Sequence, residues 1–527
     1  SFIRMKYNVL YLFLIVIVSY VLFSLQISGI EVFMLDEAKN ATCAREMMER
    51  KDFIVPTFNH ILRTDKPPLH YYFMIGAYNI FGFGAFAARF FSAVFGVLTI
   101  AITFLFARKV YDTKTAWWST IILLSSLHFI FEFHLAVPDP YLIFFINAAL
   151  FSFLLFFQFH HNHYLWFFYI ALALGFLTKG PVAVALPVLI ILVFMILTKS
   201  FRRKTIKDMK PLWGMLLFLL IAAPWYMLVS IKTNMAWTEG FFLKHNLERY
   251  TDTMQGHGGI YFLSVVFLLI GLLPFSVLLI QSMVYALKKR KHRDYFFLFI
   301  YIVVFTLFFS LSDTQLPNYI MPVYPACAIL IGRFLVNANT NMFYRYKTGL
   351  SLWAGLVISL LIPVGIYVGV DYDANLKGMN YLAYYLVPMP LAFIISLIYF
   401  YRERFYHAFK ALAAGFLIVN ILLFGKILPA VSEKSIANDF LNSRKSHYTL
   451  VSYKRINPSF IFYFQGNIPV YHDLQSLEAY LENEANYYLI TRRKYKKQLL
   501  DKFPELEVEK EREDLFEGHT TTILMND

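Results

Sequence analysis

Long apolar runs are the feature that most constrains this chain. A helix needs ~20 apolar residues to cross the hydrocarbon core of a membrane, and runs of about that length recur throughout the 527 residues. They lie near 7–28, 87–107, 116–136, 140–158, 164–178, 181–198, 211–230, 260–286, 295–311, 318–337, 349–370, 381–400 and 407–429. Only 16% of the residues are charged, whereas a soluble chain carries about 25%. The sequence therefore predicts a mainly α, polytopic membrane protein with about 13 transmembrane helices.

Basic residues divide the loops between these runs into two sets. One set contains clusters such as 202–207 and 288–293, while short loops of the other set, such as 136–140, contain no Lys or Arg. Because Lys and Arg concentrate in cytoplasmic loops, we expect the first set inside. The N-terminus is then cytoplasmic, and an odd number of spans leaves the C-terminus outside.

The net charge of +14 is a feature that nucleic-acid-binding proteins share. Here the basic residues lie in short clusters between apolar runs, as in cytoplasmic loops, so we expect no nucleic-acid partner. Cys43 and Cys327 give neither a disulfide framework nor zinc-site spacing. The run 7–28 is too long for the apolar core of a signal peptide, so we expect it to remain as the first span.

Three regions differ in composition from the spans. The outer loops 30–86 and 231–259 mix charged, aromatic and apolar residues. From 432 to 527, alternating runs such as YTLVSY and YYLITR are separated by helical patterns, which predicts a small α/β domain outside the membrane. We therefore divide the chain into a transmembrane domain, 1–431, and a soluble extracytoplasmic domain, 432–527.

The first outer loop begins with an acidic pair, Asp36 and Glu37. Apolar residues at helical spacing follow it, which predicts an interfacial helix on the membrane surface with the pair at its N-terminus. The helix dipole favours carboxylates there, so capping alone would explain the pair. The pair lies where the first span meets the outer interface, and a capping role does not exclude catalysis.

The same loop ends in Lys66-Pro67-Pro68-Leu69. The prolines fix an extended backbone after Lys66, so the ammonium group is aimed rather than mobile. A lysine is a compact charge that suits a phosphate group. A lysine that only extends its charge to the membrane interface would look the same.

The whole loop resembles the first-loop signature of the protein O-mannosyltransferase and aminoarabinose transferase group of the GT-C superfamily. Between the acidic pair and the Lys-Pro-Pro-Leu motif it contains Asp52-Phe53-Ile54-Val55-Pro56. Three further blocks follow in the family's order: Arg89-Phe90, the segment 242–250 with the following His257-Gly258-Gly259, and the segment 311–322. The resemblance covers about 30–330, while later spans and the C-terminal region match only in layout.

This resemblance implies an inverting glycosyltransferase that moves a sugar from a polyprenyl-phosphate donor, of the undecaprenyl-phosphate type, to lipid A or another envelope glycan. It places Asp36 at the catalytic acidic position and Glu37 beside it. It assigns the donor phosphate to Lys66, Arg89, Arg249 and Tyr319. The resemblance also implies the bacterial inner (cytoplasmic) membrane, with the active site facing the periplasm or the outside.

Four further positions are candidates. Gln315 stands where aminoarabinose transferases usually carry a lysine, which leaves the donor head group open. Asp139, before Pro140, resembles a second acidic position of the superfamily but would also serve as a helix cap. His245 and Asn246 belong to the block in the second outer loop.

A divalent metal ion is the one cofactor for which the sequence offers candidates. Asp65 and His257 could both bind such an ion, but two ligands do not define a site.

Three alternatives stay open. A protein O-glycosyltransferase would share the donor and differ in its acceptor. A polytopic lipid or solute transporter would place charges in the middle of its spans, whereas Glu132 and Lys179 lie near the outer ends. A non-catalytic envelope scaffold gives no reason for ordered Asp, Lys and Arg blocks on one face. The sequence names neither the sugar nor the acceptor.

Overall fold

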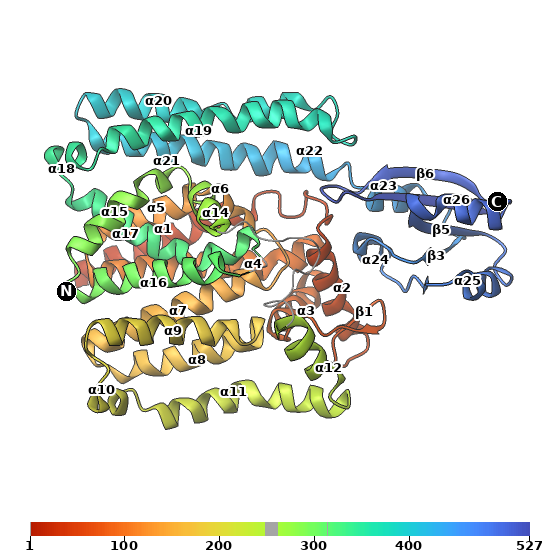
Figure 1. Cartoon of the computed structure of the whole chain (residues 1–527), viewed down its shortest axis with the longest axis horizontal. Helices are drawn as coiled ribbons and strands as arrows, with labels where there is room; N and C mark the ends of the chain where they lie inside the picture. The colour runs from red at the N-terminus through yellow and green to blue at the C-terminus, as the bar shows by residue number, and fades with distance from the viewer. Residues whose placement is uncertain (1, 248–261, 313–314, 527) are drawn as a thin grey trace.

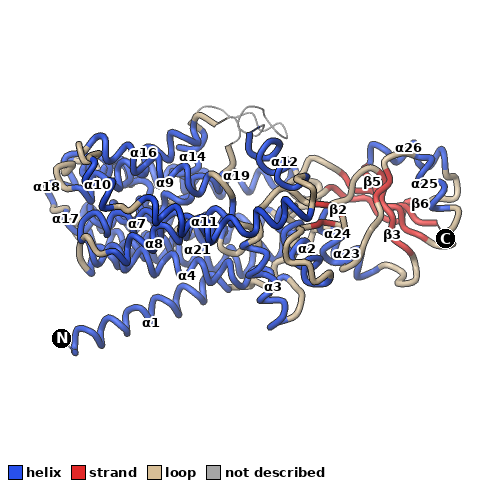
Figure 2. Tube along the Cα trace, turned by 90° about the horizontal axis from the view of Figure 1, so that it is seen from below, coloured by secondary structure: helices blue, strands red, loops and turns tan. Residues whose placement is uncertain are grey.

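The structure, a computed structural model, describes residues 2–247, 262–312 and 315–526. It consists of a long helical bundle with a small sheet domain at one end (Figure 1). The N-terminus lies at the opposite end of the bundle from the sheet domain, which carries the C-terminus (Figures 1 and 2). Every apolar run found in the sequence falls on helical structure within the described residues.

The bundle is built from the helices outside the first outer loop and the sheet domain. They are α1 (Phe2–Ser24), α4 (Ala85–Val110), α5 (Thr113–Ser125), α6 (Leu127–Glu132), α7 (Asp139–Phe159), α8 (Asn162–Lys179), α9 (Val182–Leu197), α10 (Arg203–Asp208), α11 (Pro211–Lys232), α12 (Ala236–Glu239), α14 (Leu263–Gly271), α15 (Leu279–Lys288), α16 (Arg293–Ser310), α17 (Tyr324–Asn337), α18 (Thr340–Arg345), α19 (Thr348–Gly369), α20 (Pro388–Tyr401), α21 (Phe405–Leu422) and α22 (Leu428–Ser432).

Of the described helices, eight are long and apolar enough to cross a membrane, or nine if the pair Leu263–Gly271 and Phe275–Lys288, bent by 114°, forms one span. Two shorter apolar helices cover Leu10–Ser24 and Val182–Leu197. The prediction of a mainly α, polytopic fold is confirmed, whereas the count of thirteen spans is not. Part of the difference arises because two of the runs are each divided between two helices, as α5 and α6 divide the run near 116–136, and part because of these two shorter helices.

Burial separates central from peripheral helices. In the span Pro317–Asn337, which contains α17, 83% of the apolar window is buried, against 22% in the spans that contain α11 and α19. The exposed faces of α11 and α19 carry residues such as Leu220 and Leu361. Apolar side chains on such a face match the hydrocarbon of a membrane, so α11 and α19 lie at the lipid boundary.

The first outer loop folds into α2 (Leu35–Glu49), the antiparallel pair β1 (Thr57–Phe58) and β2 (Ile61–Leu62), and α3 (Leu69–Phe81). The expected helix after Asp36 forms, but it does not simply lie on the membrane surface. Ten of its residues are buried, and its apolar side chains join a cluster that includes Met74 of α3 and Phe462 of the C-terminal region. The helix is therefore a packed element, fixed on several sides.

The C-terminal region contains the predicted α/β structure. Its five-stranded sheet has the order β4-β3-β5-β7-β6, with β3 parallel to both neighbours and β7 antiparallel to both of its own. Its elements are α23 (Ile436–Ser443), β3 (Thr449–Tyr453), α24 (Pro458–Phe464), β4 (Val470–Tyr471), α25 (Leu474–Leu481), β5 (Tyr487–Arg492), α26 (Arg493–Lys502), β6 (Glu507–Glu513) and β7 (Thr520–Asn526).

Hydrogen bonds attach this region to the first outer loop. The Tyr463 hydroxyl accepts a bond of 2.7 Å from the Val32 amide. The Asn59 side chain donates to the Ile468 carbonyl at 2.7 Å and accepts from the Ile468 amide at 3.0 Å. Such paired contacts hold the sheet region against the first outer loop. The division into domains at 431/432 remains our proposal.

Candidate active site

Glu37 and Arg89 form a buried ion pair between α2 and α4. Arg89 Nε lies 2.6 Å from Glu37 Oε1, and Nη2 lies 2.8 Å from Oε2. Both side chains are at most 2% exposed. The Ala136 amide donates a further bond of 3.0 Å to Glu37 Oε1. A bidentate, buried pair of this kind fixes the start of α2 rather than serving a substrate.

The remaining donors of Arg89 are also used. Its Nη1 donates to the carbonyls of Ile27 at 2.8 Å and Ile30 at 2.6 Å, and Nη2 donates to the Glu31 carbonyl at 3.4 Å. An arginine has five N–H donors, and all five have protein acceptors here. This geometry gives no support to Arg89 as a phosphate ligand or to Glu37 as a catalytic residue. We assign both to positioning Asp36.

Asp36 differs from its neighbour because it lies in the first turn of α2 and is exposed. A second arginine, Arg63, lies within electrostatic reach of it and is buried. Burial would lower the pKa of Arg63, but its neighbours Tyr71, Cys43, Asp65 and Asp36 raise it above the ordinary value. An acidic group that is exposed and close to a fixed cation is well placed to meet a polar substrate.

Arg63 was not among the residues expected at the site. Its Nε lies 3.3 Å from Asp65 Oδ2, and its backbone carbonyl accepts a bond of 2.9 Å from Trp237 Nε1. Neither terminal nitrogen of Arg63 has a hydrogen-bond acceptor within the described residues. The sequence signal was weak, because one arginine before the Lys-Pro-Pro motif looks like an ordinary loop residue.

His70 of α3 is fully buried, with Nε2 3.4 Å from Asn40 Oδ1 of α2. Its pKa lies well below the ordinary value, because burial disfavours the charged form and because the positive charges of Arg63, Lys66 and Lys179 oppose a further one. The electrostatic surroundings of His70 are therefore positive.

Lys179, at the end of α8, contacts two of the expected site residues. Its Nζ lies 2.6 Å from Asp139 Oδ1, in the first turn of α7, and 4.8 Å from the centre of the Tyr319 ring. Tyr319 belongs to the 3₁₀ helix Pro317–Val323. Asp139 and Tyr319 therefore lie close to one another, with Lys179 in contact with both. From the sequence, Lys179 is only a charge near the end of a span.

The side chain of Gln315 is buried and forms hydrogen bonds with neighbouring segments of the chain. Its Oε1 accepts a bond of 3.1 Å from the Ser264 amide, and its Nε2 donates to the carbonyls of Ser310 at 3.2 Å and Ser312 at 3.1 Å. The side chain is 6% exposed. Both ends of the amide are engaged, so this geometry does not support a contact between Gln315 and the donor.

Several expected site residues cannot be placed. Arg249 and His257 lie outside the described residues, and only the backbone of His245 and Asn246 is described, in the π-helix Gly240–Leu247. Within the described ranges, no group of three or more His, Cys, Asp or Glu residues could hold a metal ion. The metal-binding pair Asp65 and His257 therefore stays a prediction.

Comparisons with known sequences agree on one group of enzymes. The family described as dolichyl-phosphate-mannose-protein mannosyltransferase matches residues 65–228. An uncharacterized protein of Aquifex aeolicus (strain VF5) is 31% identical over 372 residues, 70% of this chain and 82% of the relative. An undecaprenyl phosphate-alpha-4-amino-4-deoxy-L-arabinose arabinosyl transferase of Yersinia pestis (strain Pestoides F) is 28% identical over 342 residues, which cover 62% of this chain and 60% of that enzyme's length.

Solved structures support the same relationship at the level of the fold. The crystal structure of ArnT from Cupriavidus metallidurans bound to undecaprenyl phosphate has a TM-score of 0.79 at 21% identity and covers 98% of both chains. The archaeal oligosaccharyltransferase AglB from Archaeoglobus fulgidus has a TM-score of 0.52 at 12% identity, over 94% of this chain and 70% of its own. The chain is therefore similar in sequence to the aminoarabinose transferases and the dolichyl-phosphate-mannose-protein mannosyltransferases, and it shares the fold of ArnT.

Proposed function

We propose that this chain is an inverting glycosyltransferase that moves a sugar from a polyprenyl-phosphate donor to lipid A or another envelope glycan. The observation that carries the proposal is the cluster of Lys179, Asp139 and Tyr319, in which Lys179 Nζ lies 2.6 Å from Asp139 Oδ1 and 4.8 Å from the centre of the Tyr319 ring. A donor phosphate needs cations that are already in place when its negative charge grows. The similarity to an undecaprenyl-phosphate-dependent arabinosyl transferase supports this donor class.

In the proposed reaction, Asp36 acts as the base. Its carboxylate accepts the proton of an acceptor hydroxyl, whose oxygen forms a bond to the anomeric carbon from the face opposite the phosphate. The bond between that carbon and the phosphate oxygen breaks, and its electron pair leaves with the polyprenyl phosphate. Lys66, Lys179 and Tyr319 hold that leaving group, with Arg249 as a further donor predicted from the sequence. The single displacement inverts the anomeric configuration.

The direct test is a transfer assay with the full chain in vesicles. The donor panel consists of undecaprenyl-phosphate pentoses and hexoses labelled in the sugar, and the acceptors are lipid A and total envelope glycans. We expect one donor to lose its sugar to a lipid or glycan product. Label that appears on protein instead would favour the protein O-glycosyltransferase alternative. Label that enters the vesicles without any transfer would favour a transporter and overturn the proposal.

We further propose that the site faces the periplasm or the outside of a bacterial inner membrane. The basic loops around 202–207 and 288–293 would then be cytoplasmic. Cys43 and Cys327 are buried, so single cysteines introduced at exposed positions report on sidedness with little background. In intact spheroplasts, an impermeant maleimide should label Ser446→Cys and spare Lys291→Cys. The reverse pattern would invert the proposed orientation.

A further inference from the structure

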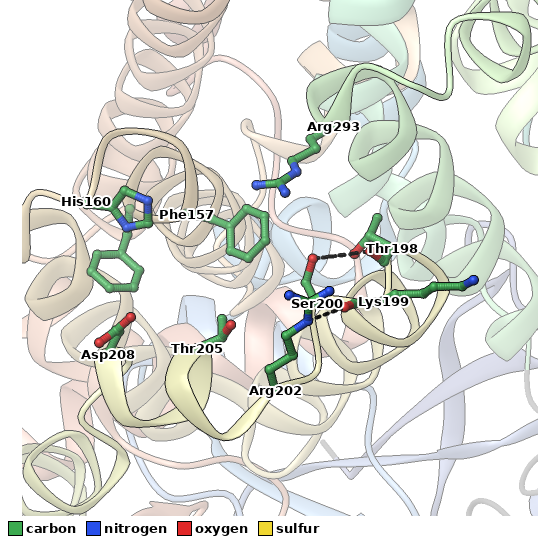
Figure 3. Close-up of a pocket in the computed structure, with 10 residues that line it drawn as sticks. Phe157, His160, Thr198, Lys199, Ser200, Arg202, Thr205, Asp208 and Arg293 are labelled. Atoms are coloured by element: carbon green, nitrogen blue, oxygen red, sulfur yellow. Dashed lines mark hydrogen bonds between the residues drawn. The ribbon is translucent and has the colours of Figure 1, made fainter.

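Two cavities adjoin at the end of the bundle away from the sheet domain. The first, shown in Figure 3, has a volume of about 200 Å³ and lies between the ends of α7, α9 and α10 and the start of α16. Its described lining includes His160, Lys199, Arg202 and Arg293, and one carboxylate, that of Asp208. Its formal charge is therefore positive, as a site for an anion requires.

Two arginines from different elements define the centre of this cavity. Figure 3 shows the guanidinium groups of Arg293 and Arg202 on either side of Phe157 and Ser200, while Lys199 points away. Arg293 lies over the Phe157 ring at 5.1 Å, and Arg202 Nε donates to the Lys199 carbonyl at 3.2 Å. Within the part of the chain that the structure describes, neither arginine forms an ion pair with a carboxylate.

The second cavity is an apolar groove of about 390 Å³ between α8, α9 and α11. Its walls include Val188, Leu192, Phe201, Ile206 and Met215. Val188 and Leu192 are 37% and 38% exposed, so the groove opens on the side where the bundle meets lipid. An acyl chain is the apolar partner that such a membrane-facing groove meets.

The groove has room partly because of a glycine. Gly214 of α11 also lines it, and a Cβ added there would come within 2.1 Å of Tyr169 Cζ. The Tyr169 ring is held in place, because its hydroxyl donates to the Met209 carbonyl at 2.7 Å. The close approach of α8 and α11 that shapes the groove therefore depends on the missing side chain.

The segment between α9 and α10 contributes to both cavities. Phe201 lines the apolar groove, and the next residue, Arg202, lines the basic cavity. On α10, Ile206 lines the apolar groove and Thr205 lines the basic cavity. A ligand with a charged head and an apolar tail would fit both at once. We propose that this composite site binds an anionic glycerophospholipid, with its phosphate between Arg202 and Arg293 and one acyl chain in the groove. In the orientation proposed above, this is a lipid of the cytoplasmic leaflet.

Lipid binding by the full chain tests this proposal, because the measurement does not depend on sugar transfer. The purified protein is exchanged into detergent with phosphatidylglycerol, phosphatidylcholine or inorganic phosphate, and native mass spectrometry counts the retained lipid. We expect retention of phosphatidylglycerol over phosphatidylcholine. Arg202→Gln with Arg293→Gln should weaken it about 30-fold, since each cation near a membrane surface contributes roughly fivefold.

Matched variants separate this site from general surface charge. Arg203→Gln with Lys204→Gln removes two exposed cations in the first turn of α10 that do not line the cavity, and should change binding less than twofold. Leu192→Trp should block the groove and reduce phosphatidylglycerol binding while inorganic phosphate binding persists. Equal losses in the two double variants, equal retention of both lipids, or preferential retention of polyprenyl phosphate from a mixture would each overturn the proposal.

Discussion

Lys179 Nζ lies 2.6 Å from Asp139 Oδ1 and 4.8 Å from the centre of the Tyr319 ring. The three residues come from α8, α7 and the 3₁₀ helix Pro317–Val323, so one ammonium group joins three segments of the bundle. Lys179 is 14% exposed and Asp139 is 9% exposed. A lysine held in this way does not need to be ordered when a phosphate arrives, which is what electrostatic catalysis requires.

Replacement of Lys179 by Met should therefore lower transfer. A charge-assisted hydrogen bond contributes about 1.5–3 kcal/mol, so we expect kcat/KM for the polyprenyl-phosphate donor to fall by ~10- to 100-fold. The matched control is Lys232→Met, because Lys232 also pairs with an aspartate of the outer region, Asp52, at 3.0 Å but is 47% exposed. If both variants lose activity equally, Lys179 has no special role at the site.

We expect Lys66 to contribute to binding of the donor and not to the stability of the fold. Lys66→Ala is expected to weaken donor binding by a similar factor, because the phosphate loses a fixed cation. Lys66→Arg should restore only part of the affinity, since a planar guanidinium group replaces a compact charge. Donor affinity is measured by equilibrium binding to the protein in detergent. Unchanged affinity in Lys66→Ala would remove this residue from the proposed site.

We expect the ion pair of Glu37 with Arg89 to stabilise the folded protein. Glu37→Gln leaves a buried guanidinium without its counter-charge, and breaking a buried pair in this way costs about 3–5 kcal/mol. We expect a clear fall in Tm in detergent and a loss of folded protein. Glu49→Gln is the control on the same helix, because Glu49 is 50% exposed and lies 3.4 Å from Arg45 Nε. A Tm shift of the same size in both variants would contradict the assignment.

Glu517 should make the stability of the C-terminal region depend on pH. Burial, and then the charge of Asp514, raises its pKa from 4.5 to about 7, although Arg455, Arg492 and Lys39 oppose the shift. Between these two values the folded state binds more protons than the unfolded state, so stability falls as pH rises through this window. The Tm of the full chain should fall from pH 5 to pH 7.5 for this reason.

The variant Glu517→Gln isolates this contribution, because the pKa of Asp514 is also raised by burial and that of His519 is lowered by burial. The difference in Tm between wild type and Glu517→Gln should change across the window from 4.5 to 7. Glu509→Gln, at an exposed position of β6, should leave the pH profile as in wild type. A constant difference between Glu517→Gln and wild type at every pH would contradict the assignment.

The sequence predicted the architecture well because its signals are local. Apolar runs of membrane length, and the alternating pattern after residue 432, each depend on nearby residues alone. The helices Leu263–Gly271 and Phe275–Lys288 form one continuous apolar run in the sequence. The bend between them is not predictable, because composition carries no information on the direction of the chain. The burial of α2 against α24 was missed for a related reason, since that contact joins residues roughly 400 positions apart.

Lys66, Asp139 and Tyr319 stay predictions of the site, made from the motifs that contain them. The structure places Lys179 against Asp139 and Tyr319. The roles of Arg89 and Gln315 were not predictable, because an arginine or an amide shows its partners only when the fold is known. Arg89 uses all five donors on Glu37 and three carbonyls. Sequence motifs thus identify polar residues but do not say whether these face a substrate or each other.

Asp36 decides whether the proposed mechanism stands. It is exposed at the start of α2, whereas the neighbouring Glu37 is buried and paired with Arg89, so the two residues of the acidic pair lie in different surroundings. Asp36 lies in the first turn of α2, whose N-cap is Met34. Asp36→Asn keeps the size of the side chain but removes the charge and the basicity. A positioned general base contributes typically 10²–10⁴-fold. We therefore expect kcat for sugar transfer to fall by about that range while the Tm and the donor affinity stay as in wild type.

The contrast with Glu37→Gln gives this prediction its control. That variant should lose stability first and activity as a consequence, whereas Asp36→Asn should lose activity alone. Asp36→Glu, which keeps the charge but moves it by one methylene, should retain part of the rate, because a base must lie within about 3 Å of the proton it takes. Near-normal transfer by stably folded Asp36→Asn would show that the carboxylate does no more than favour the N-terminus of α2, and the base would have to be another group.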